Sequence, residues 1–165
     1  MSTMTFPPIE RSLTVDADPE RAFRFFTEKI GDWWPLEDYS VFSMTGRGRP
    51  DSIHFEPGVG GRVYERLGDE EATWGEVKVW EPPHRVVMSW NTNADWPEDT
   101  EVELTFSEEG SGTRVHVRHT GFDRLGEVAE PAHTGYSRGW GEVLGRFEEA
   151  IGRKPPRCEP RTALT

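Results

Sequence analysis

The fold is decided by residues 133–152, whose sequence is HTGYSRGWGEVLGRFEEAIG. At about 100° per residue, the large apolar side chains of this stretch fall on one stripe, and charged side chains occupy the opposite side. The stripe consists of Tyr136, Trp140, Val143, Leu144, Phe147 and Ile151. The pattern predicts an amphipathic helix of about five turns, at roughly 3.6 residues per turn. Because the chain has no other long helical pattern, we expect this helix to bury its stripe against a sheet.

The composition of the chain limits the classes of partner. Its 165 residues include 19 basic and 30 acidic side chains, for a net charge of −11. Such a surface repels phosphate backbones and anionic lipid headgroups, so we expect no nucleic-acid partner and no membrane-surface role. The N-terminus lacks the basic and apolar regions of a signal peptide, which predicts a cytoplasmic protein. Cys158 is the single cysteine, so an intramolecular disulfide is excluded.

The residues before the long helix alternate between strand patterns and turn residues. Residues 9–15 are typical of a first strand, and Asp18-Pro19-Glu20 begins a short helical region that ends near Gly31. Six further strands, separated by turn residues, are expected at 52–56, 61–67, 73–81, 84–91, 101–107 and 112–120. Because consecutive strands usually pair, these patterns predict an antiparallel sheet of about seven strands.

The pattern leaves two regions open. Residues 39–42 could form a short strand, and strand 73–81 could turn either its tryptophans or its valines inward. Residues 122–132 are expected to form a polar connector. We predict one domain over residues 1–152, followed by a proline-rich, flexible tail over residues 153–165.

Several short motifs lie in a characteristic order along the chain. They are GGRVYE (60–65), WGEV (74–77), EPPHRVVMSW (81–90), GTRV (112–115), HTGF (119–122) and GW (139–140). With the order of elements, they resemble the SRPBCC superfamily of START-like and Bet v 1-like proteins over about residues 9–152. The closest resemblance is to its AHSA-like group, named after the activator of the heat-shock-protein-90 ATPase.

The resemblance implies an α+β helix-grip fold, in which a curved antiparallel sheet wraps around the C-terminal helix. Its implication for function is broader, because the superfamily includes lipid binders, cyclases, oxygenase subunits and chaperone regulators. The chaperone activators carry a separate N-terminal domain that these 165 residues do not contain. We therefore do not carry over the chaperone activity, and the resemblance transfers no catalytic residue.

Familiar catalytic and metal-binding patterns receive little support. Residues 135–139 match the G-x-S-x-G motif of serine hydrolases, but no strand precedes them and the last histidine, His133, lies upstream of the serine. His116 and His119 are three residues apart on a strand, so they point to opposite faces. We expect neither a metal site nor a cofactor.

The alternation of strand 112–120 places His119 on the apolar face. A single inward histidine is more often a hydrogen-bonded structural residue than a catalyst. Tyr136, Glu76 and Tyr64 could be its partners, or they could point toward a ligand. Gly139 and Gly141 flank Trp140, which lets a ligand or another part of the chain approach the helix backbone closely. Tight packing without a ligand explains these glycines equally well.

We predict a cavity between the sheet and the C-terminal helix that binds a small hydrophobic or amphipathic molecule. The candidate ligand-binding residues are Trp34, Tyr64, Trp74, Glu76, Trp90, His119, Tyr136 and Trp140. One alternative is a cyclase- or dehydratase-like enzyme that uses His119, Glu76 or Tyr136 as acid or base. The other is a chaperone-ATPase regulator or interaction module, which would need an exposed docking patch.

Overall fold

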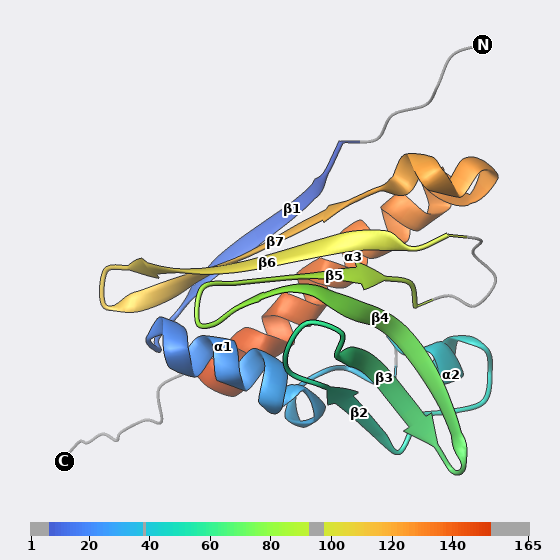
Figure 1. Ribbon diagram of the computed structural model, residues 1–165, viewed down its shortest axis with the longest axis horizontal. Helices are drawn as coiled ribbons and strands as arrows, with labels where there is room; N and C mark the ends of the chain where they lie inside the picture. The colour runs from blue at the N-terminus through green and yellow to red at the C-terminus, as the bar shows by residue number, and fades with distance from the viewer. Residues whose placement is uncertain (1–6, 38, 93–97, 153–165) are drawn as a thin grey trace.

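The computed structural model describes residues 7–37, 39–92 and 98–152. Seven strands form one antiparallel sheet in the order β1-β7-β6-β5-β4-β3-β2, and the sheet curls around the long helix α3 (Ala129–Phe147), as Figure 1 shows. The strands are β1 (Ile9–Val15), β2 (Ser52–Phe55), β3 (Arg62–Leu67), β4 (Glu70–Glu81), β5 (Arg85–Trp90), β6 (Thr100–Glu109) and β7 (Gly112–Thr120). The prediction of an α+β helix-grip fold is confirmed. The predicted tail, residues 153–165, lies outside the described residues.

The sheet is a meander that is closed by its first strand. Strands β2 to β6 each pair with the next strand in the sequence. Strand β1 instead pairs with β7, so that Ile9 lies opposite His119 and Val15 lies opposite Thr113. The first and last strands of the chain are therefore neighbours in the sheet.

Two of the helical elements, α1 (Pro19–Glu28) and α2 (Val41–Met44), begin at a side-chain cap. The others are η1 (Ile30–Asp32), η2 (Phe122–Val128), α3 and the π-helical turn η3 (Glu148–Gly152). The Asp18 side chain accepts a hydrogen bond from the Arg21 amide at 2.8 Å, as its N-cap position predicts. Helix α2 replaces the strand considered for residues 39–42. None of the described helices is long and apolar enough to span a membrane.

Helix α3 begins earlier than the sequence predicts. It starts at Ala129 rather than at residue 133, and η2 precedes it where a polar connector was expected. Pro131 fits because it lies in the first turn, where a backbone N–H has no helical partner in any case.

The two halves of α3 differ in how they are covered. In the C-terminal half, Phe147 is fully buried and its ring centroid lies 5.2 Å from that of Phe26 and 5.1 Å from that of Trp33. These partners come from α1 and the segment after it, which cross this end of the helix (Figure 1). In the N-terminal half, Gly135 and Arg138 are exposed. The helix is thus covered at its C-terminal end, whereas beside the partly buried Tyr136 part of its N-terminal half faces solvent.

A β-bulge decides the orientation of β4. Trp74 is skipped in the pairing of β4 with β3, which makes it an extra residue on its strand. Trp74 and Val77 are therefore both buried, although a regular strand would point them to opposite faces, and Glu76 is exposed. A Cβ on Gly75 would lie 1.7 Å from the carbonyl oxygen of Ser89, so only glycine fits beside the bulge.

Glu65 is a fully buried carboxylate that fixes α2 to the sheet. Its Oε1 accepts hydrogen bonds from the Val41 amide at 2.6 Å and from the indole of Trp74, and its Oε2 accepts one from the Phe42 amide at 2.9 Å. The two amides belong to the first turn of α2, where they have no helical acceptor. One side chain of β3 thus holds both this turn and the bulge tryptophan.

Replacing Glu65 with glutamine tests this anchor. Glu65→Gln keeps the shape but substitutes an NH2 group for an acceptor oxygen, so at least one buried donor loses its partner. We expect the free energy of unfolding to fall by about 1.5–3 kcal/mol in urea titrations, as for hydrogen bonds to a charged group. Glu76→Gln on the neighbouring strand is the matched control and should change stability by less than about 0.5 kcal/mol. Equal stability of the two variants would contradict the anchoring role.

Candidate functional site

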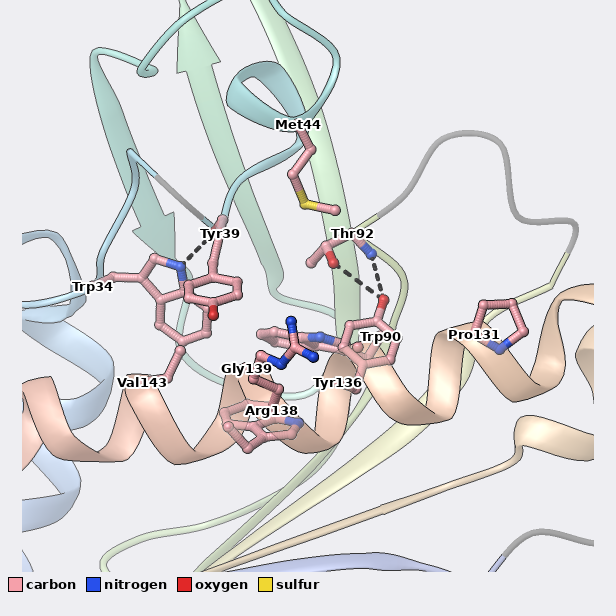
Figure 2. A pocket seen from close by; sticks show the side chains of 12 residues that line it. Trp34, Tyr39, Met44, Trp90, Thr92, Pro131, Tyr136, Arg138, Gly139 and Val143 are labelled. Atoms are coloured by element: carbon pink, nitrogen blue, oxygen red, sulfur yellow. Dashed lines mark hydrogen bonds between the residues drawn. The ribbon is translucent and has the colours of Figure 1, made fainter.

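A cavity of about 260 Å³ lies beside the N-terminal half of α3. Figure 2 shows it between the helix, the end of β5 and the segment that carries Tyr39 and Met44. Its walls are formed by Trp34, Tyr39, Met44, Trp90, Thr92, Pro131, Gly135, Tyr136, Arg138, Gly139, Trp140 and Val143. Most of these side chains are apolar or aromatic, as in sites for small organic molecules.

Three tryptophans form the base of the cavity, and a fourth supports them from behind. The ring centroids of Trp90 and Trp140 are 5.4 Å apart, and those of Trp34 and Trp90 are 5.9 Å apart. Trp74 lies behind them, 5.1 Å from Trp34 and 5.6 Å from Trp90. All four are buried. Such clusters of edge-on and tilted rings are rigid, so they present a preformed apolar surface.

His119 belongs to a closed hydrogen-bond chain beneath this surface. The Trp140 indole N–H donates to His119 Nδ1 at 2.9 Å, and His119 Nε2 lies 2.5 Å from Thr100 Oγ1. The Thr100 hydroxyl donates to the Trp90 carbonyl oxygen at 2.7 Å. These directions assign the single proton of the neutral imidazole to Nε2, which donates to Thr100. Burial lowers the pKa of His119 to about 3, which keeps the ring neutral.

Tyr136 places a hydroxyl at the wall of the cavity. Its oxygen accepts a hydrogen bond from the Thr92 amide at 3.0 Å and lies 3.1 Å from Thr92 Oγ1 (Figure 2). Burial raises the pKa of the Tyr136 phenol to about 12, so it is protonated at neutral pH. The contact also joins α3 to the residues that follow β5.

The structure separates the predicted site residues into three groups. The cavity is lined by four of them, Trp34, Trp90, Tyr136 and Trp140. Two others, Trp74 and His119, lie behind these residues and support them. The third group, Tyr64 and Glu76, lies away from the cavity.

Tyr64 and Glu76 lie elsewhere, on the outer face of the sheet. Tyr64 alternates with the buried Glu65, and its ring stacks on His54 at 4.9 Å, with the guanidinium carbon of Arg62 at 4.1 Å on the ring. Glu76 is exposed because the bulge at Trp74 turns the neighbouring valine inward. Neither residue lines the cavity.

Several residues of the cavity wall were not among the predicted site residues. For one of them, Tyr39, the glycine at position 139 was a sequence signal, because a glycine allows close approach to the helix. A Cβ on Gly139 would lie 3.3 Å from the ring of Tyr39, so the glycine admits this aromatic wall. A Cβ on Gly141 would meet nothing within 4 Å, so close approach does not explain that glycine. Met44, Thr92 and Arg138 carry no such signal.

The serine of the G-x-S-x-G motif has a structural role. Ser137 lies inside α3, and its hydroxyl accepts a hydrogen bond from Arg11 of β1 at 2.9 Å. It is not among the residues that line the cavity. A nucleophile elbow requires a turn between strand and helix, which this position lacks.

Acid should destabilise the protein through His119. The unfolded chain takes up a proton on this histidine below its ordinary pKa of about 6.5, whereas the native chain stays neutral until its pKa of about 3. The contribution is therefore complete above about pH 6.5 and is lost as the pH falls toward 3, by at most roughly 1.4 kcal/mol per pH unit. Urea unfolding of the wild type and of His119→Gln from pH 7 to pH 4 checks this expectation. A stability difference between them that does not shrink with falling pH would contradict it.

Trp140 should be essential to stability, because it is 3% exposed and donates to His119. We expect Trp140→Ala to lower the free energy of unfolding by about 3–5 kcal/mol in urea titrations. Val59→Ala, at a position that is 72% exposed, is the control and should cost less than about 0.5 kcal/mol. A loss near zero for Trp140→Ala would show that the indole faces open space.

Similar structures share this fold. The structure of Txn09, an anthrahydroquino-gamma-pyrone synthase complexed with SUM, is 32% identical, with a TM-score of 0.61 over 92% of this chain and 100% of that chain. CalC, a self-sacrificing resistance protein from Micromonospora echinospora, is 28% identical, with a TM-score of 0.62 over 88% of this chain and 94% of that chain. The Aha1 dimer from Colwellia psychrerythraea, at 17% identity over 89% and 97% of the two chains and a TM-score of 0.63, shows the fold alone.

The family is shown by a match over most of the chain. No curated protein matches the sequence. Residues 16–152 match the model of the family described as Activator of Hsp90 ATPase homolog 1-like protein. The chain therefore belongs to the family of Activator of Hsp90 ATPase homolog 1-like proteins.

Proposed function

We propose that this protein binds a small hydrophobic or amphipathic molecule in the cavity beside α3. The observation that carries the proposal is a cavity lined by Trp34, Trp90 and Trp140 within an otherwise packed core. Its volume of about 260 Å³ is just below the range of about 300–1,000 Å³ that is usual for ligand sites. A molecule of two or three rings suits this space.

The polar groups of the site support binding of an oriented ligand. Tyr136 and Thr92 place two hydroxyls on one wall, opposite the Trp34 and Tyr39 rings in Figure 2. A few polar groups in an apolar cavity fix the orientation of a ligand and provide specificity. The relative at 32% identity, a synthase complexed with SUM, supports a binding site in this family fold.

Catalysis in the same cavity is a second candidate, which the identity to that synthase favours. The three expected acid–base residues do not converge, however. Both nitrogens of His119 are engaged in the hydrogen-bond chain, and Glu76 lies on the outer face. Tyr136 lines the cavity, but with a pKa of about 12 its phenol can donate a hydrogen bond and cannot serve as a base near neutral pH. We therefore place binding ahead of catalysis.

Filling the cavity from the helix should weaken binding. Gly135 lines the cavity one helical turn before Gly139, and a Cβ there meets nothing within 4 Å. We expect Gly135→Leu to weaken binding of the uncharged probe N-phenyl-1-naphthylamine at least tenfold, because the new side chain occupies the space. Fluorescence titration measures the dissociation constant.

Gly141→Leu is the matched control for this experiment. It lies on the same helix with open space around its Cβ, but it does not line the cavity. Both variants should gain up to about 1 kcal/mol of stability from helix propensity, and only Gly135→Leu should lose binding. Absence of probe binding to the wild type, or equal weakening in both variants, would refute the proposed site.

A further inference from the structure

We propose that the molecule bound in this cavity is an aromatic acid, and that Arg138 holds its anionic group. The inference rests on the proposed function and adds the chemical class of the ligand. An aromatic acid here means one or more apolar rings that carry a carboxylate, a sulfonate or an ionised phenol. Three independent features of the cavity lead to this class.

The first feature is the free guanidinium of Arg138. Among the described residues, only Arg21, Arg118 and Arg138 are arginines whose side chains make no hydrogen bond and no ion pair. Of these three, only Arg138 lines the tryptophan cavity. Glu142, one helical turn further along α3, forms no ion pair with it. The site thus contains a cation whose counter-charge the described part of the chain does not supply.

The second feature is that the described wall of the cavity carries no acidic side chain. The chain has 30 acidic residues and a net charge of −11, yet none of the described residues that line the cavity is acidic. Among these described wall residues, a bound cation would meet Arg138 and no carboxylate. A bound anion would meet the guanidinium, whose planar fork matches a carboxylate and can also stack on an aromatic ring.

The third feature is a hydrogen-bond donor that the protein leaves unused. The indole N–H of Trp90, a wall residue, has no acceptor among the described residues. The Tyr136 phenol is hydrogen-bonded to Thr92 and stays protonated at neutral pH, so it adds no negative charge that would oppose an anion. In Figure 2 the Arg138 guanidinium projects over the cavity, in front of the Trp90 ring in this view, with the Tyr136 hydroxyl on the neighbouring wall. A ligand with acceptor oxygens would satisfy the Trp90 indole and the Arg138 guanidinium.

The geometry also indicates how such a ligand would lie. The tryptophan rings form the base of the cavity, and the exposed Arg138 stands at its opening. The apolar rings of the ligand would contact Trp34, Trp90 and Trp140, whereas the anionic group would remain near solvent. This arrangement avoids the large cost of burying an unpaired charge.

Two probes with the same rings separate the charge from the apolar contact. They are 8-anilinonaphthalene-1-sulfonate and N-phenyl-1-naphthylamine, which differ by one sulfonate. We expect Arg138→Gln to weaken binding of the sulfonate probe at least tenfold while changing binding of the uncharged probe less than twofold. Fluorescence titrations of the full chain give both dissociation constants.

Arg118→Gln is the matched control, because Arg118 is an exposed, unpaired arginine on the outer face of β7 and does not line the cavity. It removes the same charge and should change neither dissociation constant. Gly135→Leu should weaken both probes, which shows that the sulfonate probe occupies this cavity. Unchanged melting temperatures of the arginine variants show that they are folded.

The outcomes distinguish this inference from the proposed function. If the wild type binds the uncharged probe but Arg138→Gln leaves both dissociation constants unchanged, the cavity binds ligands and the assignment to Arg138 is overturned. Equal weakening of both probes by Arg138→Gln, or the same loss in Arg118→Gln, overturns it as well. If neither probe binds the wild type, the proposed function itself fails.

Discussion

The structure depends on the hydrogen-bond chain that runs from the Trp140 indole through His119 and Thr100 to the Trp90 carbonyl. It joins α3 to β7, β6 and β5 and gives each buried donor one acceptor. An unmatched buried polar group costs about 1–3 kcal/mol, so rotation of the helix about its axis is penalised. The chain thus sets which face of α3 lies against the sheet. It leaves Gly135 and Arg138 on the side where the cavity opens.

The cavity stays open because the segment that forms its outer wall, with Tyr39 and α2, is hydrogen-bonded to Trp34 and Glu65. The Trp34 indole donates to the Tyr39 carbonyl at 2.7 Å, and the Glu65 carboxylate holds the first turn of α2 through Val41 and Phe42. These bonds direct the segment toward β3 and β4. At the other end of α3 the contacts are aromatic rings from α1, which pack directly on the helix. One helix therefore closes a core at one end and borders a cavity at the other.

The spacing of apolar residues predicted the elements whose side chains alternate regularly between buried and exposed positions. The long helix, the alternation of β6 and β7 and the N-cap at Asp18 all express local rules of side-chain direction and capping. The inward position of Glu65 could not be predicted, because two of its three donors lie more than twenty positions away, at Val41 and Phe42. The orientation of β4 stayed open for a similar reason, since the bulge at Trp74 arises from pairing with β3.

The candidate site was predictable where aromatic residues coincide with the helix stripe. Tyr136 and Trp140 lie on that stripe, and the histidine beneath them follows from the alternation of β7. Tyr39 and Met44 come from a stretch without periodicity, so only the glycine at position 139 hinted at a neighbour. Arg138 lies within the G-x-S-x-G stretch, whose pattern concerns the serine and not the arginine. The role we propose for it rests on the lack of a partner for its guanidinium among the described residues, which a sequence pattern does not contain.

The pairing of β1 with β7 has a consequence for how the chain is made. Strands β2 to β6 find their neighbours nearby in the sequence, so this meander can assemble from local hairpins as it emerges during synthesis. Strand β1 emerges first, yet its partner ends only at Thr120, and α3 follows that partner. The first strand must wait for β7, and the cavity is completed only once α3, which follows β7, has been made.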